Sequence, residues 1–94
     1  MRRLLFFHAP WCPPCRFYER EFIEAIEDMA EPGQVVRINV QNDPFMAEKY
    51  LIDKLPSIVL LDGEAVKMSS TGAIDIREVA GWLKGGTGYG SVNN

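Results

Sequence analysis

The chain has 94 residues, of which 47% are hydrophobic and 24% charged, with a formal net charge of −3. This length fits one small domain with a single packed core, and the acidic balance excludes the basic surface typical of nucleic-acid-binding proteins. No apolar run approaches the roughly 20 residues of a membrane-spanning helix. We therefore expect a soluble, cytoplasmic monomer that binds neither nucleic acid nor a membrane.

The first predicted elements are a buried strand over residues 3–8 and a helix that starts just after Cys12 and Cys15. Apolar residues recur behind the cysteines at the spacing of one helical face. These positions are Cys15, Tyr18, Phe22, Ile26 and Met29. Proline and glycine at positions 32 and 33 end this helix.

A second strand is predicted over residues 35–40, because β-branched side chains dominate there. Asp43 and Pro44 then have the residue types of an N-cap and a first helical position, which predicts a short helix reaching about residue 50.

A hairpin is predicted over residues 57–69, because Asp62-Gly63 is a strong turn signal between two apolar runs. Asp75 and Glu78 resemble a capping box at the start of a last helix. Its predicted buried face consists of Ile76, Val79, Ala80 and Leu83.

The predicted order of elements is βαβαββα, which indicates an α/β fold. Two parallel strands joined by a helical crossover, plus an antiparallel hairpin, form a four-stranded mixed sheet flanked by three helices. We expect residues 1–86 to form this one domain and residues 87–94, which are glycine-rich and polar, to form a flexible C-terminal tail.

Cys12 and Cys15 are the only cysteines and lie where the first strand meets the first helix. A structural zinc ion needs about four ligands, and the only histidine, His8, leaves such a site incomplete, so no metal is expected. A structural disulfide closing so short a loop would restrain the unfolded chain very little. The pattern favours a redox-active pair, which needs no further cofactor and whose thiolate a helix N-terminus stabilises.

Several segments together resemble the thioredoxin family over residues 4–84. The matching segments are Trp11-Cys12-Pro13-Pro14-Cys15, Leu55-Pro56-Ser57, Asp62-Gly63-Glu64 and Thr71-Gly72-Ala73. The resemblance implies a thioredoxin-like fold and a protein-disulfide reductase activity. Its partners would be disulfide-containing target proteins and a thioredoxin-reductase-like electron donor.

The resemblance also implies roles for individual residues. Cys12, expected to be exposed at the helix start, is the nucleophile and Cys15 resolves the mixed disulfide. Because Pro13 and Pro14 have no N–H, the first free amide near the Cys12 sulfur is expected to be that of Cys15. The Leu55–Pro56 bond is expected to be cis. The substrate groove is expected to include Trp11, Pro13, Pro14, Leu55, Pro56 and Gly72.

The chain departs from the family at three places. It begins at the active-site strand, so it resembles a minimal version without the usual first strand and helix. Phe6 stands where the family has a buried acid that helps move the proton of the second cysteine, and Arg37 stands in place of a lysine. His8 lies two residues after Phe6 on the same face of the strand. It is a candidate for proton transfer, or else it only fills the space of an aromatic residue.

Two alternatives to a disulfide reductase remain open at this point. The first is a thiol oxidant or isomerase that uses the same cysteine pair. The second is a non-catalytic thioredoxin-like binding module, although binding alone does not require two cysteines.

Overall fold

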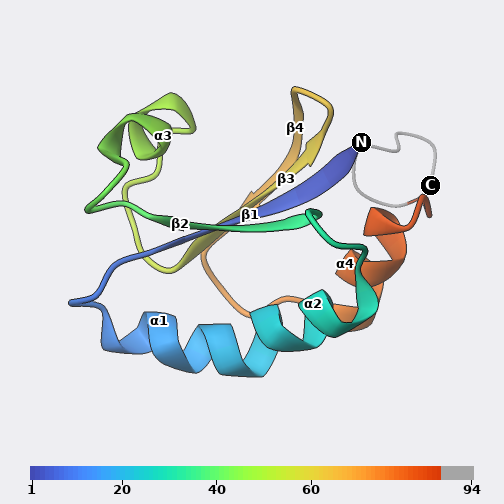
Figure 1. The fold of residues 1–94 in the computed structure, drawn as a ribbon, viewed down its shortest axis with the longest axis horizontal. Coiled ribbons are helices and arrows are strands. Elements are labelled where there is room, and N and C mark those ends of the chain that lie inside the picture. Colours follow the sequence, from blue (N-terminus) through green and yellow to red (C-terminus); the bar gives the residue numbers. More distant parts are fainter. Residues whose placement is uncertain (88–94) are drawn as a thin grey trace.

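The four strands form one mixed sheet in the order β2-β1-β3-β4 in the computed structural model, which describes residues 1–87 (Figure 1). β1 (Arg2–His8) pairs in parallel with β2 (Val35–Asn39) and antiparallel with β3 (Ser57–Asp62). β3 pairs antiparallel with β4 (Ala65–Ser70). The predicted mixed sheet and βαβαββα order are therefore confirmed.

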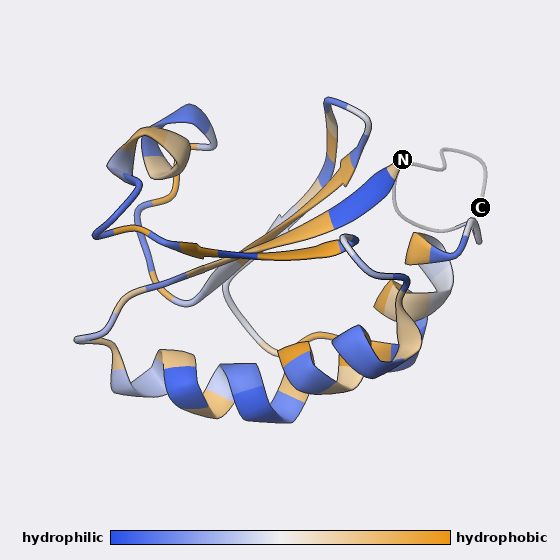
Figure 2. Cartoon of the chain, viewed as in Figure 1, coloured by the Kyte–Doolittle hydropathy of each residue, from blue (hydrophilic) through white to orange (hydrophobic). Residues whose placement is uncertain are grey.

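The central strand β1 is buried because neighbouring strands flank both of its edges and helices cover both of its faces. Its side chains alternate between two core clusters, with Leu4 and Phe6 in one and Leu5 and Phe7 in the other. Figure 2 shows that the middle of the sheet is hydrophobic, whereas the helices around it carry both hydrophilic and hydrophobic residues. A run of four apolar residues is thus what a strand buried on both faces requires.

Helices flank the sheet on both faces, as predicted. One continuous helix consists of α1 (Pro13–Tyr18), the π-helical segment η1 (Glu19–Ile23) and α2 (Glu24–Met29). It lies with α4 (Ile76–Leu83) on one face of the sheet, and α3 (Pro44–Lys49) covers the other face (Figure 1).

The segment η1 changes which side chains the long helix buries. Ile23 is completely buried, whereas Phe22, which the regular helical spacing selects, is only half-buried. A π-turn contains one more residue than an α-turn, so it places one further residue, Ile23, on the buried face. The prediction missed Ile23, whereas the predicted positions Phe22 and Ile26 both pack in the core cluster or against it.

Both predicted helix starts after the motif are confirmed by their caps. The carboxylate of Asp43 accepts a hydrogen bond from the Met46 N–H at 3.2 Å, with Pro44 at the first helical position. The carboxylate of Asp75 accepts from the Glu78 N–H at 3.0 Å. These bonds satisfy backbone donors that have no partner inside the helix.

The last helix buries one large residue that the sequence pattern did not select. Trp82 is 1% exposed, and the guanidinium of Arg2 lies 4.7 Å from the centre of its ring. This cation–π contact joins the start of β1 to α4. The predicted tail lies, except for residue 87, outside the described residues.

The buried side chain of Gln34 connects three segments that are distant in the sequence. Its amide nitrogen donates to the carbonyl oxygens of Arg2 at 3.1 Å and Leu83 at 2.7 Å. Its amide oxygen accepts from the Glu31 N–H at 2.9 Å. The turn before β2 is therefore fixed to both β1 and the end of α4.

Candidate active site

Cys12 and Cys15 form a disulfide at the junction between β1 and α1, where the carboxyl end of β1 leads into the helix (Figure 1). A turn closed by the Cys12 N–H and the Ala9 carbonyl oxygen, at 3.3 Å, brings the first cysteine to the helix start. Pro13 and Pro14 occupy the first two helical positions, where a missing N–H removes no intrahelical bond. The cysteine spacing thus places one sulfur at the cap and the other one turn inside.

The surroundings of the cysteines differ from the expectation in two respects. Cys12 is only 6% exposed and Cys15 3%, since both belong to the core cluster that contains Phe6. The expected exposure of Cys12 was wrong, because its side chain is covered both by the helix and by neighbouring segments of the core cluster. The amide of Cys15 is not free, since it donates to the Cys12 carbonyl oxygen at 3.0 Å.

The Leu55–Pro56 peptide bond is cis, as predicted. Pro56 is buried, and the hydroxyl of Ser57 donates to the Lys54 carbonyl oxygen at 2.6 Å, which closes the turn around the proline. Leu55 packs against the core cluster that includes both cysteines. The residue before Pro56 and the two cysteines therefore contribute to one core cluster.

Trp11 is 67% exposed and is thus not a core residue. Its side chain lines a cavity of about 200 Å³ together with Leu55 and with residues of α3 and of the segments before and after that helix. A large exposed aromatic beside a small apolar cavity, one residue before the first cysteine, is suited to contact a bound protein segment. Pro13 and Pro14 are also exposed next to it.

Gly72 is exposed in the connection between β4 and α4. Its carbonyl oxygen accepts a hydrogen bond from the hydroxyl of Tyr18 at 2.9 Å, and its N–H donates to the Ser70 hydroxyl oxygen at 3.3 Å. The first of these bonds connects the predicted groove segment to the helix that contains both cysteines. No such role is predicted for Tyr18 from the residues around it in the chain.

Phe6 and His8 lie side by side on the face of β1 that packs against the long helix. Their rings are stacked, with centroids 5.2 Å apart and an interplanar angle of 15°. His8 is half-buried, and burial, followed by the positive charge of Arg37, lowers the pKa of its imidazole below 6.5. The imidazole is therefore mostly neutral at pH 7 and able to accept a proton.

Arg37 on β2 forms a surface ion-pair network with the long helix. Its guanidinium binds the carboxylate of Glu27 through two nitrogens, at 3.0 and 2.6 Å, and also pairs with Glu19. Its charge is thus engaged by two acids on the helix, although it still acts on His8. An arginine cannot release a proton as the lysine of the family can.

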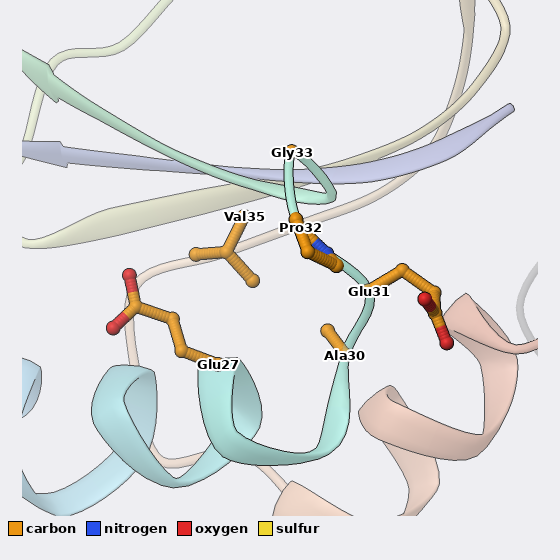
Figure 3. A pocket seen from close by; sticks show the side chains of 6 residues that line it. All are labelled: Glu27, Ala30, Glu31, Pro32, Gly33 and Val35. Carbon is orange, nitrogen blue, oxygen red and sulfur yellow. The ribbon is translucent and has the colours of Figure 1, made fainter.

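Another cavity, of about 260 Å³, lies at the turn between α2 and β2, at the opposite end of the long helix from the disulfide (Figures 1 and 3). It is lined by Glu27, Ala30, Glu31, Pro32, Gly33 and Val35. It contains neither a thiol nor an imidazole, so it offers no redox chemistry.

Within residues 1–87, no three or more His, Cys, Asp or Glu side chains are grouped in a way that would hold a metal ion. No helix in this part of the chain has the length and apolar character needed to cross a bilayer.

Comparison with known proteins identifies the family. The family model described as Thioredoxin matches residues 2–85. Thioredoxin Y1 of the chloroplast of Arabidopsis thaliana is 39% identical over 62 residues, which are 65% of this chain and 36% of that protein. Thioredoxin of Bacillus subtilis is 34% identical over 64 residues, which are 67% of this chain and 62% of that protein. The chain thus spans less than two thirds of the length of these relatives.

Solved structures agree with the fold. A mutant thioredoxin from Halobacterium salinarum has a TM-score of 0.68 at 23% identity, covering 99% of this chain and 78% of that one. Thioredoxin of Fasciola hepatica has a TM-score of 0.72 at 20% identity, covering 88% of this chain and 78% of that one. With the family match over nearly its whole length, the chain belongs to the thioredoxin family.

Proposed function

We propose that this protein is a thiol–disulfide oxidoreductase that reduces disulfides in target proteins. The observation that carries the proposal is the Cys12–Cys15 disulfide at the start of α1, next to Trp11, which lines one cavity with Leu55. Membership of the thioredoxin family supports the same chemistry. No metal or organic cofactor is needed, because the two sulfurs themselves carry the two electrons.

The reaction starts from the dithiol form. The Cys12 thiolate attacks one sulfur of the target disulfide, which forms a mixed disulfide and releases the other target sulfur as a thiolate that takes up a proton. The Cys15 thiol loses its proton and attacks the Cys12 sulfur, which releases the second target thiol. The target is reduced by two electrons and the Cys12–Cys15 disulfide forms again, so a thioredoxin-reductase-like donor must return two electrons.

The target would lie as an extended segment across the turn at Pro56. Main-chain hydrogen bonds in such a strand-like complex tolerate many sequences, which suits a reductase with several targets. The residues proposed to border this groove are Trp11, Pro13, Pro14, Leu55, Pro56 and Gly72.

We also propose His8 as the group that takes the Cys15 proton, since Phe6 provides none of the chemistry of a buried acid. A neutral imidazole on the same strand face supports this role. The alternative is that His8 only packs against Phe6.

We further propose that the protein acts as a monomer in the cytoplasm. A cysteine pair of this kind in a reducing compartment such as the cytoplasm is usually catalytic, not structural.

The reduction of insulin by the dithiol form tests the proposal. Turbidity from precipitating insulin chains should appear with dithiothreitol and the protein well before it appears with dithiothreitol alone. A Cys12→Ser, Cys15→Ser double variant serves as the control and should not differ from dithiothreitol alone. Binding of targets without faster reduction would instead identify a non-catalytic module.

The reduction potential separates a reductase from an oxidant. We expect a value between about −280 and −220 mV against a glutathione or dithiothreitol buffer, because no histidine lies between the cysteines to stabilise the Cys12 thiolate further. A value near about −120 mV would contradict the reductase assignment and favour a thiol oxidant.

A further inference from the structure

Tyr18 is a buried residue on the same helix as the reactive pair, three positions after Cys15. Its ring is stacked on Phe6, with centroids 5.9 Å apart and an interplanar angle of 6°. A second aromatic neighbour, Phe22, is tilted against it with centroids 4.7 Å apart. Contacts with two rings fix the direction in which the Tyr18 hydroxyl points.

The hydroxyl of Tyr18 ends at the connection between β4 and α4. It donates to the Gly72 carbonyl oxygen at 2.9 Å, and the sequence separation between the two residues is 54. On the other side of the same glycine, the Ser70 hydroxyl oxygen accepts from the Gly72 N–H. Figure 1 shows this connection passing from the sheet to the helical layer. Both backbone polar groups of Gly72 are therefore held by side chains.

The hydroxyl of Tyr18 acts as a permanent donor. Burial raises its pKa to about 12, so it keeps its proton over the whole range in which thiols exchange with disulfides. It therefore has no part in proton transfer, unlike the role proposed for His8. The role that remains for the Tyr18 hydroxyl is to hold Gly72 in position through this hydrogen bond.

We propose that Tyr18 is a positioning residue for target proteins, because its hydroxyl holds the segment around Gly72 against the helix that contains Cys12 and Cys15. This inference rests on the proposed function. The segment around Gly72 borders the proposed groove, so its distance from the helix sets how well an extended target strand fits. A small disulfide reaches Cys12 without using that side of the groove. Tyr18 therefore affects the binding of protein targets and not the exchange chemistry.

The variant Tyr18→Phe tests this inference, since it keeps the stacked ring and removes only the hydrogen bond. One bond of this kind is worth about 0.5–1.5 kcal/mol, so we expect KM for insulin to rise about two- to twelvefold, at about 1.4 kcal/mol per factor of ten. The rate with a small aromatic disulfide should change by less than about twofold. Amides of residues 71–75 should exchange with solvent deuterium faster than in the parent protein.

Tyr50→Phe is the matched control, because it removes the same hydroxyl on the other face of the sheet. Within residues 1–87 the Tyr50 hydroxyl has no hydrogen-bond partner, and its ring packs near Phe7. This variant should leave KM for insulin unchanged. The inference is overturned if Tyr18→Phe leaves KM unchanged, or if it slows protein and small disulfides equally. If the parent protein reduces neither substrate, the proposed function fails instead.

Discussion

The imidazole of His8 lies stacked on the ring of Phe6, the residue that stands where thioredoxins have a buried acid, with centroids 5.2 Å apart. In β1 the titratable imidazole of His8 therefore lies beside position 6, where the family has the carboxylate. Tyr18 is stacked on the same Phe6 ring. Because the rings of His8 and Tyr18 both stack on Phe6, an aromatic side chain suits this position, which is usually polar in the family.

The variant His8→Phe should lose part of its target-reduction rate near pH 7. The imidazole accepts a proton only when neutral, and its pKa lies below 6.5, so the parent protein keeps its advantage down to that lower pKa. Above about pH 8.5 a cysteine thiol ionises unaided, and the two rates should converge. The measurement is the pH profile of single-turnover insulin reduction. Identical profiles would leave His8 as a packing residue only.

The variant Arg37→Gln should raise the pKa of His8, because the positive charge of Arg37 lowers it. His8 is the only histidine, so its proton resonances give the titration curve directly by NMR. Arg3→Gln is the control, since Arg3 lines a cavity on the opposite face of the sheet with Tyr50. A lowered or unchanged pKa in Arg37→Gln would contradict the electrostatic account. The ion pairs of Arg37 are partly exposed, so their loss should lower the free energy of unfolding by at most about 1 kcal/mol.

The two cysteines should behave differently towards targets. Cys12→Ser should abolish turnover, whereas Cys15→Ser should accumulate mixed disulfides, because the resolving thiol is missing. In the reduced parent protein, iodoacetamide should modify Cys12 faster than Cys15, since the sulfur at the helix cap has the greater thiolate character. Mass spectrometry of the modified protein measures both rates. Accumulation of mixed disulfides by the Cys12 variant would reverse the assignment.

The variant Pro56→Ala should weaken target reduction, with a higher KM for insulin, because the turn that presents the backbone beside the disulfide depends on this proline. Pro44→Ala is the matched control, since Pro44 occupies the first position of α3. Initial rates over a range of insulin concentrations measure the effect. Equal KM values for the two variants would show that Pro56 has no special role in binding.

The variant Gln34→Ala should lower the free energy of unfolding by about 2 kcal/mol or more. It leaves the buried carbonyl oxygen of Leu83 and the partly buried one of Arg2 without the donor that now serves both. Urea unfolding measures this loss. Gln41→Ala, at an exposed position outside the core clusters, is the control and should change stability by less than about 0.5 kcal/mol.

The sequence predicted the features that depend on local chemistry. The strand-to-helix position of the cysteines and the caps at Asp43 and Asp75 all follow from residues close together in the chain. The cis bond before Pro56 was predicted from the resemblance to thioredoxin, since an isolated proline is seldom cis.

The remaining features depend on tertiary packing. Trp82 is buried in the core cluster between the sheet and the helices, and Arg2, 80 positions earlier, lies over its ring and binds its carbonyl oxygen. Cys12 is covered by segments that no local pattern brings together. The bond between Tyr18 and Gly72 also joins distant segments, although one signal was present: a tyrosine on the predicted buried face needs a partner for its hydroxyl.

The single π-turn of η1 lets the long helix hold one residue more than a regular helix with the same number of turns. Each residue of an α-helix rotates the chain by about 100° about the helix axis, but a π-turn takes up its extra residue within one turn. Removing one residue from Glu19–Ile23 would therefore restore a regular helix and leave Cys15 facing much as it does now relative to Ile26. The same deletion in α2 would rotate Cys15 by about 100° relative to the residues that follow and move its sulfur away from the side that faces the sheet. A change in the length of this helix would thus keep the disulfide aligned only within η1.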